Sequence, residues 1–229
     1  MFSFCSEGFH AFGFIFDLSS RVVVCGDLSA GASALAASGI PVGAAGLKFS
    51  DVPATAAFYT EIMWVAEKGI ISGFADGTFR PLALMNRGSM AATLHKLAGS
   101  PSYTAPRTSY FQDVPLSHPF FKQISWMVDS GVTYGWGDGS FRPGDPVTRN
   151  AVAASLYRMA GSPGYIAPSV SPYTDIGPGS AYYKGMCWMA SMGISKGWPD
   201  DTLRPVESVQ RNALCAFLYR YRKNVATAS

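Results

Sequence analysis

Residues 49–229 repeat themselves three times at a fixed period of 62 residues, and this period constrains the fold more than any other feature. It separates Asp51, Asp113 and Asp175 (113 − 51 and 175 − 113), and no copy needs a gap. Such a period is typical of one supersecondary unit used repeatedly, in which each copy buries its apolar face against its neighbours. The other positions related in this way are Trp64, Trp126 and Trp188, then Arg80, Arg142 and Arg204, then Arg87, Arg149 and Arg211.

The period also sets the expected domain limits. We expect one three-repeat domain over 49–229, with repeats at about 49–110, 111–172 and 173–229. Residues 1–48 lie outside the repeat and lack the basic segment that opens a signal peptide. We therefore expect them to be a weakly structured leader, a remnant of a longer protein or the result of a misassigned start.

The composition narrows the class of partner. The hydrophobic content of 48% suffices for a core, while charged residues make up only 14% of the chain and aromatic residues another 14%. A typical soluble domain has about 25% charged residues, so this surface is expected to be rich in aromatic and small polar side chains, as in sugar-binding proteins. The net charge of +3, without any Lys/Arg run, argues against nucleic acid. No stretch reaches the roughly 20 apolar residues that a membrane span needs.

Each copy predicts a helix, a turn-rich loop and a second helix. In the first copy Phe58, Ile62 and Val65 give an apolar helical face, and Gly69 supplies a left-handed residue that ends the helix. The second helix is expected to begin at the arginine that follows a capping position, which is filled by Asn86, Thr148 and Gln210. We expect the apolar second helices to pack together about a pseudo-three-fold axis, which would give one mainly α domain with three grooves between copies.

The loop between the helices carries an Asp-Gly turn in two of the three copies. Asp-Gly followed by a β-favouring residue and proline predicts a tight turn with a very short strand. An arginine precedes that proline, and we expect it to close the loop by bridging to the aspartate of the turn. The loops run from Gly73 to Pro81, from Gly135 to Pro143 and from Gly197 to Pro205.

These motifs resemble the S-layer homology (SLH) family, whose domains usually carry three such copies. The resemblance covers 49–229, and the matching segments are Phe49-Ser50-Asp51-Val52-Pro53 with its two counterparts, the helix tryptophan, the Gly-aromatic-x-Asp-Gly-x-Phe-Arg-Pro loop, and the Thr148-Arg149 helix start. It implies a three-pronged helical spindle with a central three-helix bundle. It also implies non-covalent anchoring of surface proteins to a bacterial cell-wall polysaccharide, often a pyruvylated polymer that bears carboxylates, and hence a cell-surface location.

The family places the arginine of a Thr-Arg-Ala-Glu motif in the groove against an acidic sugar. This chain keeps all three arginines but lacks the glutamate in every copy, reading Arg87-Gly88-Ser89, Arg149-Asn150-Ala151 and Arg211-Asn212-Ala213. An arginine in the first turn of a helix opposes the helix dipole, and an anion resolves this conflict. The alternative interpretation is a bridge from each arginine to Asp51, Asp113 or Asp175, or to a carbonyl of a neighbouring copy.

The loop residues complete the predicted glycan site. Phe74, Trp136 and Trp198 each follow a glycine on the loop, where an exposed ring can stack on a sugar, although packing beneath the turn is the alternative. Trp64, Trp126 and Trp188, by contrast, are expected to pack in the core or between copies. The remaining predicted site residues are Asp76, Asp138 and Asp200, and Gly73, Gly135 and Gly197.

Other chemistries find little support in the sequence. The cysteines show no C-x-x-C spacing, and Cys187 and Cys215 have apolar or small counterparts, so neither zinc nor a disulfide is expected. Calcium is excluded at the loop because Arg142 stands where a ligand is required. Non-equivalent histidines and the absence of a nucleophile motif argue against an enzyme, and no cofactor is expected. The hypothesis is therefore an anchor for anionic wall glycan; the alternatives are a protein–protein or self-association module, or a fragment of a larger secreted enzyme or adhesin.

Overall fold

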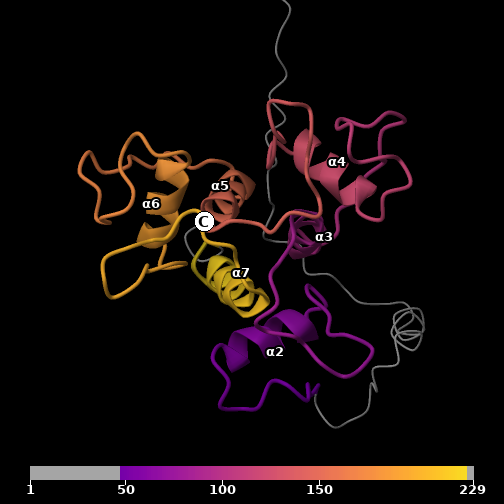
Figure 1. Ribbon diagram of the computed structural model, residues 1–229, viewed down its shortest axis with the longest axis horizontal. Coiled ribbons are helices and arrows are strands. Elements are labelled where there is room, and N and C mark those ends of the chain that lie inside the picture. The colour runs from indigo at the N-terminus through magenta and orange to yellow at the C-terminus, as the bar shows by residue number, and fades with distance from the viewer. Residues whose placement is uncertain (1–46, 226–229) are drawn as a thin grey trace, which may run out of the picture. The chain divides into compact units, whose positions relative to one another are not determined.

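The computed structural model describes residues 47–225, all of which belong to one compact unit of the chain. The mainly α class is confirmed: residues 47–225 form six helices and, apart from isolated bridges, no strand. Figure 1 shows them as three pairs. Their bounds are α2 (Tyr59–Glu67), α3 (Arg87–Leu97), α4 (Phe121–Asp129), α5 (Arg149–Met159), α6 (Tyr183–Ser191) and α7 (Arg211–Val225). None of these helices is both long enough and apolar enough to cross a membrane.

The helix ends follow the sequence signals closely. Gly69, Gly131 and Gly193 have φ angles of 65°, 67° and 63°, so each first helix ends at the predicted left-handed glycine. The second helices begin at the predicted arginines. The predicted cap is made at Asn86, whose side chain accepts a hydrogen bond from the Ser89 N–H at 2.7 Å, whereas the Thr148 side chain makes no such cap bond.

The helices pack in pairs that join consecutive repeats. The second helix of each repeat lies against the first helix of the next, as α3 against α4 and α5 against α6, and α7 closes the series on α2. An edge-to-face aromatic contact marks each interface, and its tryptophan is the one that was predicted to pack. The ring pairs are His95–Trp126 at 5.1 Å, Tyr157–Trp188 at 5.4 Å and Trp64–Tyr219 at 5.4 Å.

The prediction of very short strands within the loops is wrong. The described residues form only isolated bridges, and these lie after the loop, just before the second helices. Their partners come from other repeats. The Met85 N–H donates to the Val209 carbonyl, the Val209 N–H to Val147 and the Val147 N–H to Met85, at 2.9, 2.9 and 2.8 Å.

These three hydrogen bonds close a cycle through all repeats. Together with the three helix pairs, they show that each repeat completes its packing only with the other two. The closest helix pairs do not join two second helices to each other, so the spindle with a central three-helix bundle stays a prediction. Cys187 and Cys215 are buried free thiols, while Cys5 and Cys25 lie outside the described residues.

Candidate functional site

The turn of each loop neutralises its own charge. In the second repeat Asp138 accepts hydrogen bonds from the N–H and the hydroxyl of Ser140, at 2.9 and 2.6 Å, and pairs with Arg142 at 2.6 Å. The hydroxyl bond and the arginine together lower the pKa of Asp138 to about 2. Asp76 with Arg80 and Asp200 with Arg204 repeat the arrangement, so the predicted loop-closing bridge is present in all three copies.

A second aspartate fixes the end of each turn. Both carboxylate oxygens of Asp113 accept backbone N–H groups, from Phe141 at 2.8 Å and from Arg142 at 2.6 Å. Arg142 itself has a φ of 58°, a left-handed conformation that this clamp stabilises. Asp51 and Asp175 make the same pair of bonds. The aspartates considered as partners of the helix arginines therefore bind the loop backbone instead.

The predicted site glycines lie where backbone and ring approach each other closely. A Cβ atom on Gly135 would stand 2.1 Å from the Phe111 ring and 2.9 Å from the Ser140 carbonyl, and the residue has a φ of 68°. Gly73 and Gly197 are crowded in the same way by Phe49 and Tyr173. These positions require glycine for the turn itself, and any role in binding is one of shaping the loop.

The helix arginines are held very differently. Each lies half-buried and donates its Nε–H to a backbone carbonyl of another repeat, which is one of the interpretations that the sequence left open. The partners are the carbonyls of Phe141 for Arg87 at 2.7 Å, Leu203 for Arg149 at 2.9 Å and Phe79 for Arg211 at 2.9 Å. Within the part of the chain that the structure describes, no carboxylate lies within 4.0 Å of any of the three guanidinium groups.

Burial of these charges has an electrostatic consequence. Desolvation lowers the pKa of Arg87 and Arg211, and it lowers that of Arg149 to about 10. All three remain protonated at neutral pH because even that value lies well above 7. A half-buried cation without a counterion is poorly solvated. The electrostatic free energy of binding an anion is therefore more favourable there than at an exposed cation.

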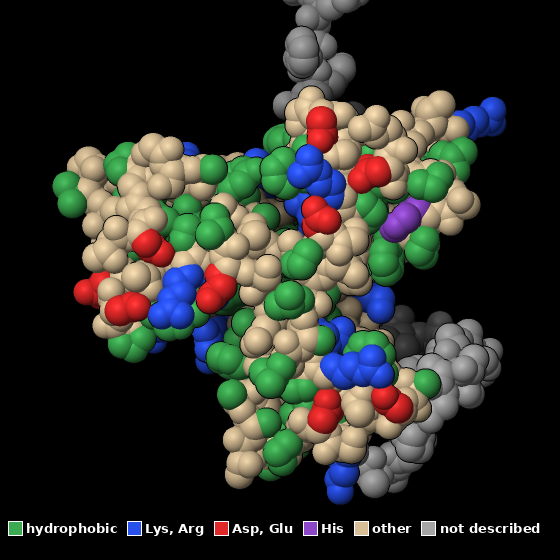
Figure 2. All heavy atoms as spheres, in the orientation of Figure 1, with side chains coloured by type: hydrophobic (Ala, Val, Ile, Leu, Met, Phe, Trp, Pro, Cys, Tyr) green, Lys and Arg blue, Asp and Glu red, His purple; other side chains and the backbone are tan. Residues whose placement is uncertain are grey.

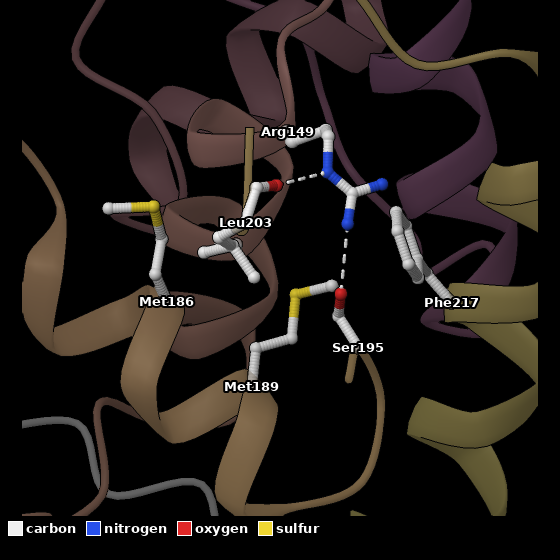
Figure 3. Close-up of a pocket in the computed structure, with 7 residues that line it drawn as sticks. Arg149, Met186, Met189, Ser195, Leu203 and Phe217 are labelled. Atoms are coloured by element: carbon white, nitrogen blue, oxygen red, sulfur yellow. Dashed lines mark hydrogen bonds between the residues drawn. The ribbon is translucent and has the colours of Figure 1, made fainter. Parts of the chain in front are cut away.

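Figure 3 shows the surroundings of Arg149 in detail. Its Nε donates to the Leu203 carbonyl and its Nη2 to the Ser195 hydroxyl at 3.0 Å, above a small pocket walled by Met186 and Met189. Ser195 was not among the predicted site residues, because it belongs to none of the recognised motifs. The Phe217 ring, 5.2 Å from the guanidinium carbon, is a further neighbour. Apart from Arg149 and Ser195, the residues that line this pocket are apolar.

The structure brings each predicted loop aromatic to the predicted arginine of another repeat. The guanidinium carbons of Arg149 and Arg204 lie 4.2 and 4.5 Å from the centre of the Trp198 ring. The other two sites have the same composition. Trp136 lies 5.7 Å from Arg87 and 4.5 Å from Arg142, and Phe74 lies 5.1 Å from Arg211 and 3.9 Å from Arg80. Each of these three composite sites therefore joins a loop from one repeat to a helix start from another.

On one face of the molecule the charged side chains are grouped rather than spread evenly. On the face drawn in Figure 2, Lys and Arg side chains form separate clusters with acidic side chains beside them. The described part of the chain has three exposed pairs of opposite charge, Asp76–Arg80, Asp138–Arg142 and Asp200–Arg204. A continuous basic surface of the kind that follows a nucleic-acid backbone is not seen on this face. Among residues 47–225, no three His, Cys, Asp or Glu side chains are grouped so that they could hold a metal ion.

Comparison with known proteins gives one consistent family. The model of the S-layer homology domain matches residues 48–91, 110–153 and 172–211. A cellulosome-anchoring protein of Acetivibrio thermocellus is 27% identical over 154 residues, which cover 66% of this chain and 34% of that protein. The S-layer protein EA1 of Bacillus anthracis is 32% identical over 138 residues, covering 60% of this chain and 16% of that protein.

One relative has an enzyme name. A protein of Bacillus anthracis described as an uncharacterized cell wall amidase is 29% identical over 170 residues, which cover 71% of this chain and 30% of that protein. In all three comparisons the chain spans about a third or less of the relative's length.

Proposed function

Because this chain belongs to the S-layer homology domain family, we propose that it is a non-catalytic module that anchors a protein to the bacterial cell wall by binding an anionic wall polysaccharide. The names of two relatives, an anchoring protein and an S-layer protein, support a role at the cell surface. The pairing of half-buried arginines with loop aromatics supports the finer statement, that the ligand is an acidic glycan.

The observation that carries the proposal is the unmatched charge of the helix arginines. Arg87, Arg149 and Arg211 have no carboxylate partner among the residues described, although Arg80, Arg142 and Arg204 do. A carboxylate on a sugar would supply the missing charge and accept the guanidinium N–H groups that the protein leaves free. The neighbouring ring would stack on the apolar face of the same sugar.

Three such sites on one folded unit suit a repeating polymer. A single sugar–protein contact is weak, but linked sites bind a polymer with an avidity that can exceed the individual affinity by about 10²–10⁴. The absent motif glutamates do not remove this advantage, since the three arginines and three loop rings remain in place. The pyruvylated polymer implied by the family resemblance is one glycan with the required carboxylates.

Co-sedimentation with purified Gram-positive cell walls tests the proposal. The full chain is mixed with intact walls and with walls from which the polysaccharide has been removed chemically, which leaves the peptidoglycan. We expect the protein to sediment with intact walls and to stay in solution with stripped walls. Equal binding to stripped walls would replace the glycan with a protein or peptidoglycan partner, and no binding to either would refute the anchoring role.

A further inference from the structure

The Arg87 guanidinium keeps more free donors than its two counterparts. Arg149 and Arg211 each use Nη2 as well as Nε, donating to the Ser195 hydroxyl at 3.0 Å and to the Ser72 carbonyl at 2.9 Å. Arg87 donates only its Nε–H, and its terminal nitrogens have no acceptor among residues 47–225. Since a guanidinium carries five N–H donors, the Arg87 site has the largest unused capacity for an oxygen ligand.

Exposed aromatic rings are found on the loop that contacts this arginine and at the start of α6. Tyr134, Trp136 and Tyr182 have exposed fractions of 68%, 48% and 47%, and they are three of the four exposed aromatic side chains in the described part of the chain. Trp136 lies 5.7 Å from Arg87. Tyr134 precedes Trp136 by two residues on the same loop. Burial lowers the pKa of Arg87, and the electrostatic effect of Tyr182 opposes that shift.

A further arginine lies between the two tyrosines. The Arg158 guanidinium carbon is 4.8 Å from the Tyr134 ring centre and 5.6 Å from that of Tyr182, and Nη1 donates to the Val132 carbonyl at 3.3 Å. Its counterpart Arg220 approaches a carboxylate at 3.8 Å. Arg158 has no carboxylate within 4.0 Å among the described residues, because the position that holds Glu61 in the first repeat is Gly185 in the third.

The other repeats do not reproduce this group. The counterparts of Tyr134 are Ser72 and Lys196, and the counterpart of Arg158 in the first repeat is Lys96. Aromatic residues do recur at the position of Tyr182, but Phe58 and Phe120 are half-buried there. The group formed by Tyr134, Arg158 and Tyr182 therefore has no equivalent at the other two sites.

We propose that Tyr134, Arg158 and Tyr182 form a second sugar subsite beside Arg87, so that this site takes an anionic oligosaccharide of at least two sugar units. The proposal rests on the proposed function and assigns a longer ligand to one of its three sites. Arg87 with Trp136 holds the acidic sugar, and the tyrosine rings stack on the next sugar in the polymer. Arg158 donates hydrogen bonds to the hydroxyl or carboxylate oxygens of that second unit.

The test uses Tyr134→Ser, which installs the residue found at the equivalent position of the first repeat, in the full chain. The matched control is Lys196→Ser at the equivalent position of the third repeat. Oligosaccharides released from purified Gram-positive cell walls are separated into single-unit and four-unit fractions and titrated into each protein by calorimetry. Because both side chains are exposed, neither change should alter the fold, which circular dichroism checks.

We expect Tyr134→Ser to weaken the tightest binding step of the four-unit fraction, which we assign to the Arg87 site, about fivefold to tenfold and to leave the single-unit fraction unaffected. Lys196→Ser should change neither affinity by as much as twofold. Arg158→Lys, which keeps the charge but loses the planar fork, should weaken the four-unit fraction in the same direction. An unchanged four-unit affinity in Tyr134→Ser would overturn the subsite while leaving the wall-anchoring proposal intact; failure of the original protein to bind any fraction would overturn both.

Discussion

Arg142 and Arg149 stand seven residues apart in the second repeat, yet they are held in opposite ways. Arg142 lies in the turn, where it pairs with Asp138 of the same repeat at 2.6 Å and is 42% exposed. Arg149 lies at the helix start, half-buried, and bonds to the carbonyl of Leu203 in the next repeat. The turn is therefore complete within one repeat, whereas the helix start is complete only when another repeat is present.

From this difference we infer that the turn serves mainly stability and that the helix start is the place to look for binding. The turn carries its own counterion and leaves little charge for a ligand, so its side chains act mainly to fix the loop. The helix start leaves a cation without a carboxylate, so it is available to an anion. Changes within the turn should therefore alter the free energy of unfolding, and changes at the helix start should alter affinity.

The largest expected effect on stability is at the glycine that opens the turn. Gly135→Ala would drive a methyl group into the Phe111 ring and the Ser140 carbonyl at a φ of 68°. We expect it to lower the free energy of unfolding by about 3–4 kcal/mol, from overpacking and left-handed strain together. Urea denaturation followed by tryptophan fluorescence measures the loss.

Gly139→Ala is the matched control for that change. Gly139 has a φ of 78° but no atom within 4 Å of an added Cβ, so only the strain is introduced. Its cost should be about 1 kcal/mol. Equal losses at the two positions would show that the close approach of Phe111 to the turn is not what requires glycine.

The next largest effect is expected at the aspartate that clamps the turn. Asp113→Ala removes two hydrogen bonds from the backbone N–H groups of Phe141 and Arg142 to a carboxylate. The loss should be about 2–3 kcal/mol, whereas Asp113→Asn, which keeps one acceptor, should lose less. Thermal unfolding monitored by circular dichroism distinguishes them, and an Asp113→Ala protein as stable as the original would contradict the clamp.

A smaller effect concerns the pH dependence of the turn. The bond from the Ser140 hydroxyl, then the bond from Arg142 and the bond from the Ser140 N–H, lower the pKa of Asp138 to about 2, below an ordinary aspartate value of about 3.9. Because the folded-state pKa is depressed, the stabilisation is present above the ordinary value and is lost as the pH falls through about 2. NMR titration of the carboxyl carbon should give a midpoint near 2.

Variants of the two donors, Ser140 and Arg142, test which of them causes the low pKa of Asp138. Ser140→Ala removes the hydroxyl bond and keeps the backbone one; it should raise the Asp138 midpoint further than Arg142→Gln, since the hydroxyl bond is the largest single cause of the shift. The reverse order would assign the low pKa to the ion pair. A midpoint near the ordinary value in the original protein would contradict the closed turn itself.

The sequence predicted these elements to different extents, for physical reasons. Helix starts at Arg87 and its counterparts, and helix ends at Gly69 and its counterparts, depend on local signals that recur at each period, so they were predicted correctly. The turn bridges span four residues and were also within reach of local reasoning. The predicted loop strands were wrong because backbone N–H groups at the end of each loop are bound by an aspartate side chain, as Phe141 and Arg142 are by Asp113. The backbone pairing forms after the loop instead, where Met85 and Val147 find partners in other repeats that a local pattern does not reveal.

The site was predicted by residue type but not by partner. The partners of the helix arginines lie 54 or 132 residues away along the chain, and only the closed arrangement of repeats brings them together. Comparing the copies position by position would have distinguished Tyr134 from Ser72 and Lys196, because only one copy has an aromatic residue there. The role of Ser195 had no such signal. Whether the predicted residues bind glycan stays a prediction.

The most direct test compares how much each of the two sets of arginines contributes to the affinity for wall polysaccharide. One triple variant carries Arg87→Gln, Arg149→Gln and Arg211→Gln, which removes the charge but keeps a donor for each carbonyl. The matched variant carries Arg80→Gln, Arg142→Gln and Arg204→Gln. Circular dichroism and the thermal midpoint establish that each is folded before binding to polysaccharide released from purified cell walls is measured by calorimetry.

We expect the helix-start variant to bind at least about 30-fold more weakly, which is equivalent to a loss of about 2 kcal/mol of binding free energy with the unpaired cations. The turn variant should stay within about threefold of the original affinity, because its arginines are already paired with aspartates. A folded helix-start variant with unchanged affinity, or a larger loss in the turn variant, would contradict the assignment of anion binding to Arg87, Arg149 and Arg211.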